Sequence, residues 1–197
     1  IEFAQGRFTI AGTDRGIGIM ELAAKIREIG PLPQDVPNEL DSRTVYDQAP
    51  MAYPNGCHIC EVEIDPDTGH VKIDRYLSVN DFGVIVNPLL VEGQAHGGIV
   101  QGIGQALIER VAYSEDGQLL TGSYMDYGLP RADDLPSFGF ESAPDPCKTN
   151  PLGAKGCGEA GCAGSLPAVM NAISDALGGK HINMPATPEA VWAALNQ

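Results

Sequence analysis

Polar and apolar residues alternate along two neighbouring stretches in the middle of the chain. In residues 57–65 one set of side chains falls on a common face of an extended strand: His58, Cys60, Val62 and Ile64. In residues 70–81 the same period groups a second set: Val71, Ile73, Leu77 and Val79. The segment between them, DPDTG, has the composition of a tight turn. The pattern therefore predicts a β-hairpin, with His58 as a core or edge residue rather than a ligand.

A helical spacing of apolar residues predicts a helix over residues 20–29. We expect Thr13-Asp14 to cap this helix and Gly30-Pro31 to end it. Ahead of it the sequence predicts two short strands and the turn between them: residues 1–3, 8–10 and 4–6. From Pro31 to Pro54 repeated prolines break any regular pattern. That stretch is expected to be an irregular connection, either a linker or an extended arm.

The longest predicted helix begins at Asn87-Pro88, because Asn is a good N-cap and Pro is favoured at the first helical position. It is expected to reach about Arg110. Five glycines interrupt it: Gly93, Gly97, Gly98, Gly102 and Gly104. Each lowers helix stability by up to about 1 kcal/mol relative to Ala, so they indicate a close approach to the backbone. A packed helix–helix seam and a bound ligand are both compatible with that closeness.

Two further helices are predicted near the end of the chain. Ser165-Leu166-Pro167 has the cap and the first-turn proline of a helix that ends at Gly178-Gly179. Its apolar face is formed by Val169, Met170, Ile173 and Leu177. Thr187-Pro188-Glu189 opens the last helix, while a second hairpin and a short strand precede both: residues 111–120 and 139–143. This mixture of β-hairpins and helices predicts an α+β fold.

The composition narrows the class of protein. The chain has 197 residues, of which 43% are hydrophobic and 19% charged, as in ordinary globular proteins. A net charge of −14 argues against nucleic acid or an anionic membrane as a partner. No apolar run is long enough to cross a bilayer, and a cytoplasmic protein is expected. Because the chain starts at Ile1 rather than Met, we expect a piece of a longer polypeptide.

The five cysteines do not form a metal site by their spacing. Cys57 and Cys60 make a CxxC, but in an alternating strand they point to opposite faces. No second CxxC or HxxxH completes a zinc set. Reduced thiols are therefore expected.

The sequence PLGAKGCGEAGCAGS, residues 151–165, is the strongest candidate for a functional loop. Its glycines leave backbone N–H groups uncovered around a single carboxylate, Glu159, which is a candidate general base. A surface turn is the alternative. Residues 156–161 match GxGxxG, but the segment ahead of them, DPCKTNP, is no buried strand, so a Rossmann site is excluded. Neither a Walker motif nor a GxSxG nucleophile elbow occurs.

Two segments carry a resemblance to a known family: VEGQAHGGIVQGIGQALIE (residues 91–109) and NPLGAKGCGEAGCAGSLPAVMNAISDAL (residues 150–177). The hairpin sequence EVEIDPDTGHVKI and the following VNDFGVIVNP share it. Together they resemble the C-terminal part of the molybdenum-binding subunit of the xanthine dehydrogenase, aldehyde oxidase and carbon monoxide dehydrogenase family. The resemblance covers most of the chain from about residue 56, in consistent order and spacing.

This resemblance implies a role for particular residues. Glu159 would be the catalytic base, which lies beside molybdenum without ligating it and takes a proton from a metal-bound hydroxide. Gln101 resembles the glutamine that hydrogen-bonds the pterin. The loop whose backbone contacts a molybdopterin cytosine dinucleotide is matched by Lys155, Gly156, Cys157 and Gly158. No protein ligand to the metal is implied.

The resemblance also implies how the chain is organised. Residues 1–55 would form an N-terminal hairpin, helix and extended connection, and residues 56–197 one lobe of the molybdopterin-binding domain. The other pocket walls are expected in the upstream part of the same large subunit, and iron–sulfur clusters and FAD on other subunits or domains. Cys157 and Cys162 have the first spacing of a plant-type iron–sulfur set, but Ser165 stands where the third cysteine should be.

The implied activity is that of a molybdenum hydroxylase, which oxidises an aldehyde or an N-heterocycle with water as the oxygen source. Two alternatives stay open. One is a member of the carbon monoxide dehydrogenase type, and the other is a non-catalytic lobe that binds cofactor or a partner subunit.

Overall fold

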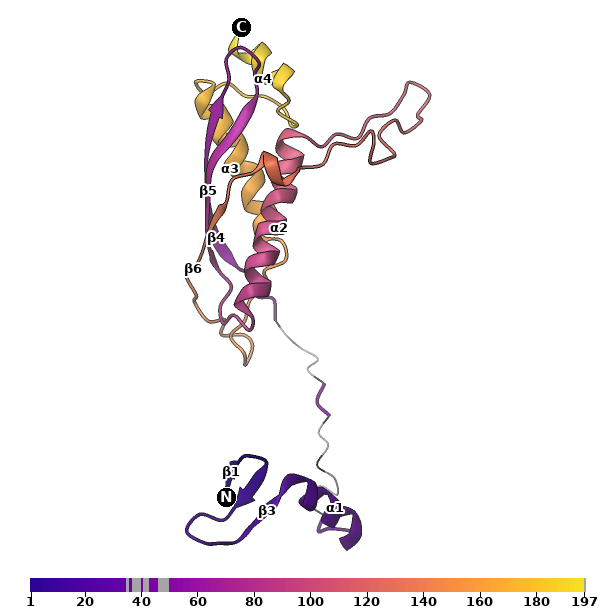
Figure 1. Ribbon diagram of the computed structural model, residues 1–197, viewed down its shortest axis with the longest axis vertical. Coiled ribbons are helices and arrows are strands. Elements are labelled where there is room, and N and C mark those ends of the chain that lie inside the picture. The colour runs from indigo at the N-terminus through magenta and orange to yellow at the C-terminus, as the bar shows by residue number, and fades with distance from the viewer. Residues whose placement is uncertain (35, 37–39, 41–42, 46–49, 197) are drawn as a thin grey trace. The chain divides into compact units, whose positions relative to one another are not determined.

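The computed structural model describes residues 1–34, 36, 40, 43–45 and 50–196. It divides into two compact units, Ile1–Gln48 and Ala49–Gln197 (Figure 1). The irregular connection expected over residues 31–54 lies partly outside the described residues.

The first unit is a small antiparallel sheet followed by one helix. Its strands pair in the order β1 (Glu2–Ala4), β2 (Arg7–Thr9) and β3 (Gly16–Gly18), and α1 (Ile19–Ile29) follows. The predicted hairpin at the start of the chain is thus present, shifted by one residue. Among the described residues of this unit none is buried.

The predicted cap of α1 is wrong. The helix begins directly after β3, and its N-cap is Gly18, which makes no side-chain cap. Thr13 instead closes a turn ahead of β3, because its hydroxyl donates to the Ile10 carbonyl over 2.8 Å. The predicted end is confirmed, since Gly30 follows the helix with a φ of 79°.

The second unit contains a three-stranded sheet in the order β4 (Asn55–Ile64), β5 (Val71–Asp81) and β6 (Phe138–Ser142). β4 and β5 form the predicted antiparallel hairpin, and β6 joins β5 in parallel. The turn between β4 and β5 is held by Asp65, whose carboxylate accepts from the Asp67 N–H at 2.9 Å and the Thr68 hydroxyl at 2.8 Å. Its last residue, Gly69, has a φ of 72°.

A β-bulge changes which residues of β5 face the core. Glu61 pairs with Arg75 and Val62 with Ile73, so Asp74 is the extra residue on β5. Beyond the bulge the alternation is inverted, and the buried side chains are those of Tyr76, Ser78 and Asn80. Leu77 is 37% exposed. The prediction that Leu77 and Val79 share the inner face with Ile73 is therefore wrong.

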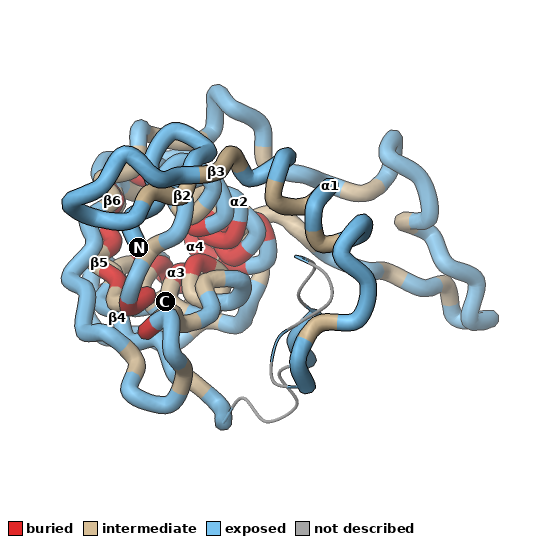
Figure 2. The backbone as a smooth tube through the Cα atoms, turned by 90° about the horizontal axis from the view of Figure 1, so that it is seen from below, coloured by how far each residue is buried: buried red, intermediate tan, exposed pale blue. Residues whose placement is uncertain are grey.

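Helices α2 (Pro88–Leu107), α3 (Ala160–Ala176) and α4 (Pro188–Leu195) complete the core of this unit. α2 and α3 run along the sheet (Figure 1), and the buried stretches gather among these helices and β5 (Figure 2). The largest contributors to the core come from all of these elements: Ile73, Tyr76, Ile99, Ile103, Val169, Ile173 and Val191. The predicted α+β fold is confirmed.

The predicted start of α2 is confirmed, and its end lies three residues earlier than expected. Asn87 caps the helix by accepting from the Leu90 N–H at 3.2 Å. At the other end the N–H groups of Ile108 and Glu109 both donate to the Gly104 carbonyl, at 2.8 and 2.7 Å. This arrangement turns the chain out of the helix.

Four of the five glycines of α2 divide into two sets, while a Cβ on the fifth, Gly104, would meet Glu109 and Pro130. A Cβ on Gly98 or Gly102 would meet α3, at Gly161 and Cys162 or at Ser165. The predicted close helix–helix seam is therefore present at these two positions. A Cβ on Gly93 or Gly97 would meet nothing within 4 Å. At these two positions α2 thus lacks a side chain, although no neighbouring element of the described chain requires it.

The predicted start of α3 is wrong, because the observed N-cap is Glu159, six residues before the predicted cap Ser165. The helix begins at Ala160, and Ser165 lies inside it, fully buried, with its hydroxyl donating to the Cys162 carbonyl at 3.2 Å. Pro167 also lies within the helix. The small residues ahead of Ser165 pack against α2, and this tertiary contact extends the helix beyond its local start signal.

The last helix, α4, begins as predicted, with the Thr187 hydroxyl accepting from the Ala190 N–H at 3.4 Å. The predicted strand near residues 139–143 is β6. The predicted hairpin over residues 111–120 is reduced to a single bridge between Tyr113 and Leu119, within a segment that extends away from α2 (Figure 1). Within the described residues, none of the helices combines the length and apolar composition that a membrane crossing requires.

Candidate functional site

Glu159 stands at the N-terminus of α3 and faces a depression of about 320 Å³. The depression lies between the first turn of α3 and the paired strands β4 and β5, where it is lined by Gly56, His58, Asn80 and Gly164 among others. The Glu159 side chain is exposed and makes no hydrogen bond or ion pair with any residue that the structure describes. Its carboxylate is therefore free to accept a proton or a ligand.

His58 and Asn80 line this depression and belong to a hydrogen-bonded chain of three residues, which buried Tyr76 completes. His58 Nδ1 lies 2.7 Å from the Tyr76 hydroxyl, and His58 Nε2 lies 3.4 Å from Asn80 Oδ1. Burial raises the pKa of Tyr76, which stays protonated and donates to Nδ1. Burial also lowers the pKa of His58, against the opposing effect of its hydrogen bond to Asn80. With the Tyr76 hydroxyl donating to Nδ1, the neutral form of the ring carries its proton on Nε2, which faces Asn80 Oδ1.

The histidine ring also sets the spacing between the sheet and α3. A Cβ on Gly164 would lie 2.6 Å from three ring atoms of His58. Only a glycine at this position of α3 allows the helix to approach the ring so closely. His58 is thus the partly buried edge residue that its strand position predicts, and it supports the turn that carries Glu159.

The backbone ahead of Glu159 presents uncovered hydrogen-bond donors. Among the described residues, no acceptor binds the N–H groups of Gly156, Cys157 and Gly158. The N–H groups of the first turn of α3 have no partner within the helix either. A Cβ on Gly156 or Gly158 would meet nothing within 4 Å. These donors, together with the positive end of the helix dipole, suit an anionic group such as a phosphate.

α2 reaches this loop through a glutamine that the sequence reasoning did not select. Gln94 Nε2 donates to the Gly158 carbonyl over 3.2 Å. Gln101 is exposed on the same helix, four residues after the open position Gly97. The structure therefore brings Gln94 to the loop, while Gln101 projects from α2 without a partner among the described residues. In the sequence, Gln94 is marked as a candidate only by its polar amide directly after Gly93 in a predicted helix.

Lys155 is held inside the protein at two points. Its ammonium group forms an ion pair with Asp81, in which the two side chains are 9% and 12% exposed. Its backbone N–H donates to the Phe82 carbonyl at 2.9 Å. Asp81 accepts two further hydrogen bonds, from the N–H groups of Gly83 and Asp145, each at 2.9 Å. The hydrogen bond from Lys155 is the main cause that lowers the pKa of Asp81, and the pKa of Lys155 is raised in turn.

The five described cysteines are all free thiols. Cys57 is exposed and Cys60 is partly buried, as expected for residues on opposite faces of β4. Burial raises the pKa of Cys60 to about 11, so its thiol stays protonated. Among the residues that the structure describes, no three His, Cys, Asp or Glu side chains gather as a metal site.

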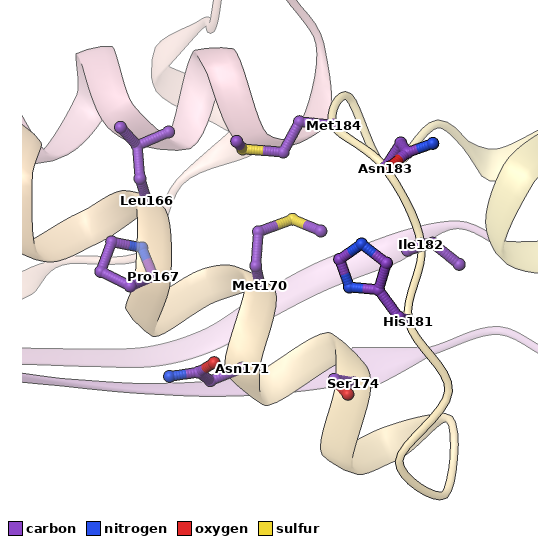
Figure 3. Close-up of a pocket in the computed structure, with 9 residues that line it drawn as sticks. All are labelled: Leu166, Pro167, Met170, Asn171, Ser174, His181, Ile182, Asn183 and Met184. Carbon is purple, nitrogen blue, oxygen red and sulfur yellow. The ribbon is translucent and has the colours of Figure 1, made fainter.

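A second hollow, of about 460 Å³, lies between α3 and the segment that leads to α4 (Figure 3). Met170 and Met184 extend into it, and the rings of Pro167 and His181 stand at its sides. None of the site residues predicted from the sequence lines it. Its lining is mixed, and it brings together no carboxylate with a base or with a set of free donors.

The arrangement around Glu159 fits a large, partly anionic ligand. Open glycine positions occur on the loop, at Gly156 and Gly158, and on α2, at Gly93 and Gly97. The unpaired backbone donors of residues 156–158 directly precede the free carboxylate in the chain. A pterin carrying phosphate groups matches this set, because its flat ring needs close backbone contact and its phosphates need N–H donors.

Known proteins share the sequence and the fold of this chain. A family model described as a molybdopterin cofactor-binding domain matches residues 1–136. The chain is 39% identical, over 98% of its length, to the 6-hydroxypseudooxynicotine dehydrogenase complex subunit gamma of Paenarthrobacter nicotinovorans. It is 34% identical, over its whole length, to the carbon monoxide dehydrogenase large chain of Afipia carboxidovorans.

A solved structure shows the same fold. Quinoline 2-oxidoreductase from Pseudomonas putida 86 superimposes with a TM-score of 0.86 over 98% of the chain, at 34% identity. In all three comparisons the chain spans 25% of the length of the protein that it matches.

Proposed function

Because this chain belongs to the molybdopterin-binding large subunits of the xanthine dehydrogenase, aldehyde oxidoreductase and carbon monoxide dehydrogenase family, we propose that it forms the catalytic-base lobe of a molybdenum hydroxylase. The observation that carries this proposal is the free carboxylate of Glu159 beside a row of unpaired backbone donors. The family match supplies the cofactor that such a site would hold.

The residues toward the cofactor have separate roles in this proposal. The N–H groups of Gly156, Cys157 and Gly158 bind phosphate oxygens, and the open positions of Gly93 and Gly97 admit the pterin close to α2. Gln101 donates a hydrogen bond to the pterin. The cofactor is the molybdopterin cytosine dinucleotide form, and when bound it supplies the two-electron oxidation.

Glu159 provides the proton chemistry. Its carboxylate accepts a proton, at either oxygen, from the water-derived nucleophile while the substrate carbon is hydroxylated. No other side chain among the described residues forms a hydrogen bond with the carboxylate. Glu159 therefore does not have to break a hydrogen bond within the protein before it accepts the proton. His58 and Gly164 keep the turn that bears Glu159 at a fixed distance from the sheet.

We assign an N-heterocycle or an aldehyde as the substrate class. Quinoline is an N-heterocycle, and it stands in the name of a structure that matches nearly the whole chain. Other subunits or domains carry the iron–sulfur clusters and FAD that remove the electrons, in keeping with a relative named as a complex subunit. The free thiols suit a reducing compartment, so we place the enzyme in the cytoplasm.

The test is reconstitution of the large subunit. The chain is produced with the rest of a large subunit and its partner subunits, and molybdenum and pterin are measured per chain. Nucleotide release on hydrolysis identifies the dinucleotide. We expect stoichiometric molybdenum, release of CMP, and incorporation of ¹⁸O from labelled water into hydroxylated quinoline or into the acid from an aldehyde.

Two other outcomes identify the alternatives. Oxidation of carbon monoxide, but of neither organic substrate, would assign the chain to the carbon monoxide dehydrogenase type. One relative that matches the whole of this chain is a carbon monoxide dehydrogenase large chain by name. Full cofactor content without turnover of any of the three substrates would make the chain a non-catalytic binding lobe. The observation that favours a non-catalytic binding lobe is that Glu159 is exposed toward an open depression.

A further inference from the structure

The segment that carries Glu159 is suspended between two anchors. On its C-terminal side, α3 packs against α2 so closely that a Cβ on Gly161 would overlap the Ala95 carbonyl. On its N-terminal side, Lys155 is bonded to the end of β5. Between them, the hydrogen bond that the structure gives to residues 156–158 is the one from Gln94 to the Gly158 carbonyl. The position of Glu159 therefore depends on these two sets of contacts, which we call the C-terminal and the N-terminal anchor.

The N-terminal anchor is centred on the Asp81 carboxylate. One oxygen accepts the N–H groups of Gly83 and Asp145, at 2.9 Å each, and the other accepts the Lys155 ammonium group. With side chains only 9% and 12% exposed, the ion pair of Lys155 and Asp81 is largely shielded from water. Removal of one partner would leave the other charge buried and uncompensated.

The backbones of the two segments are also in direct contact. Lys155 N–H donates to Phe82 O and Val84 N–H donates to Gly153 O, both at 2.9 Å. A Cβ on Gly83 would overlap the Gly153 carbonyl, and both glycines have positive φ, 60° and 69°. Only glycine fits this approach without strain. The loop ahead of Glu159 is thus built onto the end of β5 and does not hang free.

We propose that Lys155 is a positioning residue, which acts through its partly buried ion pair with Asp81 to fix the start of the segment 156–159. It does not itself bind the cofactor. Both its ammonium group and its backbone N–H already have partners inside the protein. The importance of this anchor for catalysis rests on the function proposed above, whereas the anchor itself can be tested without it.

Backbone order parameters of the 197-residue chain measure the anchor directly. Lys155→Met and Asp81→Asn are compared with Glu61→Gln, which breaks an exposed ion pair to Arg75 on the same sheet, 2.7 Å long and with side chains 50% and 75% exposed. We expect the order parameters of Gly156 and Gly158 to fall from about 0.85 to below about 0.6 in the two anchor variants. They should be unchanged in Glu61→Gln. Unchanged values in Lys155→Met would overturn the proposal.

A double variant covers the case in which a single variant fails to fold. Asp81→Asn with Lys155→Met removes both charges together, so that no unpaired charge remains buried. We expect this chain to fold and to show the same loss of order at Gly156 and Gly158. A double variant as rigid as the parent chain would show that the ion pair is not the anchor.

Kinetics of the assembled enzyme separate positioning from direct cofactor binding. A misplaced Glu159 should lower kcat by about 100-fold with little change in KM. The effects of Lys155→Met and Asp81→Asn should be alike and not additive, and molybdenum content should stay constant. If Lys155 held the cofactor itself, Lys155→Met would reduce molybdenum content, while Asp81→Asn would leave it intact and the proposal would fail. An inactive parent enzyme whose two variants still lose order at Gly156 would contradict the proposed function but support the anchor.

Discussion

Two carboxylates near the glycine-rich loop differ in what surrounds them. Asp81 has both oxygens occupied by donors, and these hydrogen bonds lower its pKa. Glu159, at the other end of the loop, has no donor among the described residues. A group whose charged form is already satisfied is a poor base, because protonation would break its bonds. Of the two, Glu159 is the carboxylate whose oxygens the described residues leave without a donor.

Chemistry at single residues was easier to predict from the sequence than the partners of those residues. Glu159 stood out because glycines surround it, and this feature needs no knowledge of the fold. The partner of Lys155 did not, since Asp81 lies 74 residues earlier in the chain. The bond from Gln94 to the loop spans 64 residues. Such contacts follow from how α2 and β5 lie beside the loop, which local patterns do not specify.

His58 should make the stability of the folded chain depend on pH. Because burial lowers the pKa of His58 in the folded state, the unfolded chain binds the proton more readily. The stability contributed by neutral His58 is complete above the ordinary pKa of 6.5 and is lost as the pH falls toward the lowered folded value. His58→Gln, which does not titrate, should remove most of the difference in denaturation midpoint between about pH 7.5 and about pH 5.5.

The exposed His70 provides the control for this experiment. His70→Gln should keep the pH dependence of the parent chain. A parent chain whose midpoint is the same at both pH values would show that His58 is not held in its neutral form.

At the scale of elements, the seam between α2 and α3 gives a matched pair of glycine substitutions. A Cβ on Gly102 would overlap the Ser165 hydroxyl, whereas a Cβ on Gly97 would meet nothing within 4 Å. Gly102→Ala should therefore destabilise the chain by about 1–3 kcal/mol through overpacking. Gly97→Ala should stabilise it by up to about 1 kcal/mol, because Ala is the better helix former. Urea denaturation measures both, and equal effects of the two substitutions would contradict the seam.

Elements with strong local signals were predicted well. The β4–β5 hairpin, the Asn87 cap of α2 and the Thr187 cap of α4 all follow from short sequence patterns. The burial pattern of β5 beyond Arg75 could not be predicted, because the bulge at Asp74 inserts one residue and turns every later side chain to the other face. Nothing in the alternation of the sequence marks that insertion.

The start of α3 was predicted wrongly for a different reason. Ser165 and Pro167 form a good local start signal, but the glycine-rich residues before them gain a close contact with α2 when they are helical. Packing of this kind outweighs local propensity in most protein helices. The consequence for the site is direct, since Glu159 becomes the residue at the helix N-terminus and does not lie in a free loop.

At the scale of the whole molecule, the two units differ in how much they bury. The buried core residues belong to the unit that spans Ala49–Gln197. In the unit Ile1–Gln48 none of the described residues is buried, and Phe3, Met20 and Ile29 are more than half exposed. A unit of this size without a core is not expected to fold alone.

Truncation tests this difference. A chain of residues 49–197 should melt at the same temperature as the 197-residue chain, because its core is complete. A chain of residues 1–48 should show no cooperative unfolding by circular dichroism. Loss of folding in residues 49–197 would show that the second unit depends on the first.

The central claim is that Glu159 is the base of a molybdenum hydroxylase, and one substitution tests it most directly. Glu159→Gln is made in the reconstituted enzyme, and molybdenum content and kcat are measured together. Because the exposed side chain supports no internal contact among the described residues, the variant should fold and retain its metal. Its kcat should fall by about 10²- to 10⁴-fold, the usual contribution of a general base. A variant that keeps its molybdenum and turns over at nearly the parent rate would contradict the assignment.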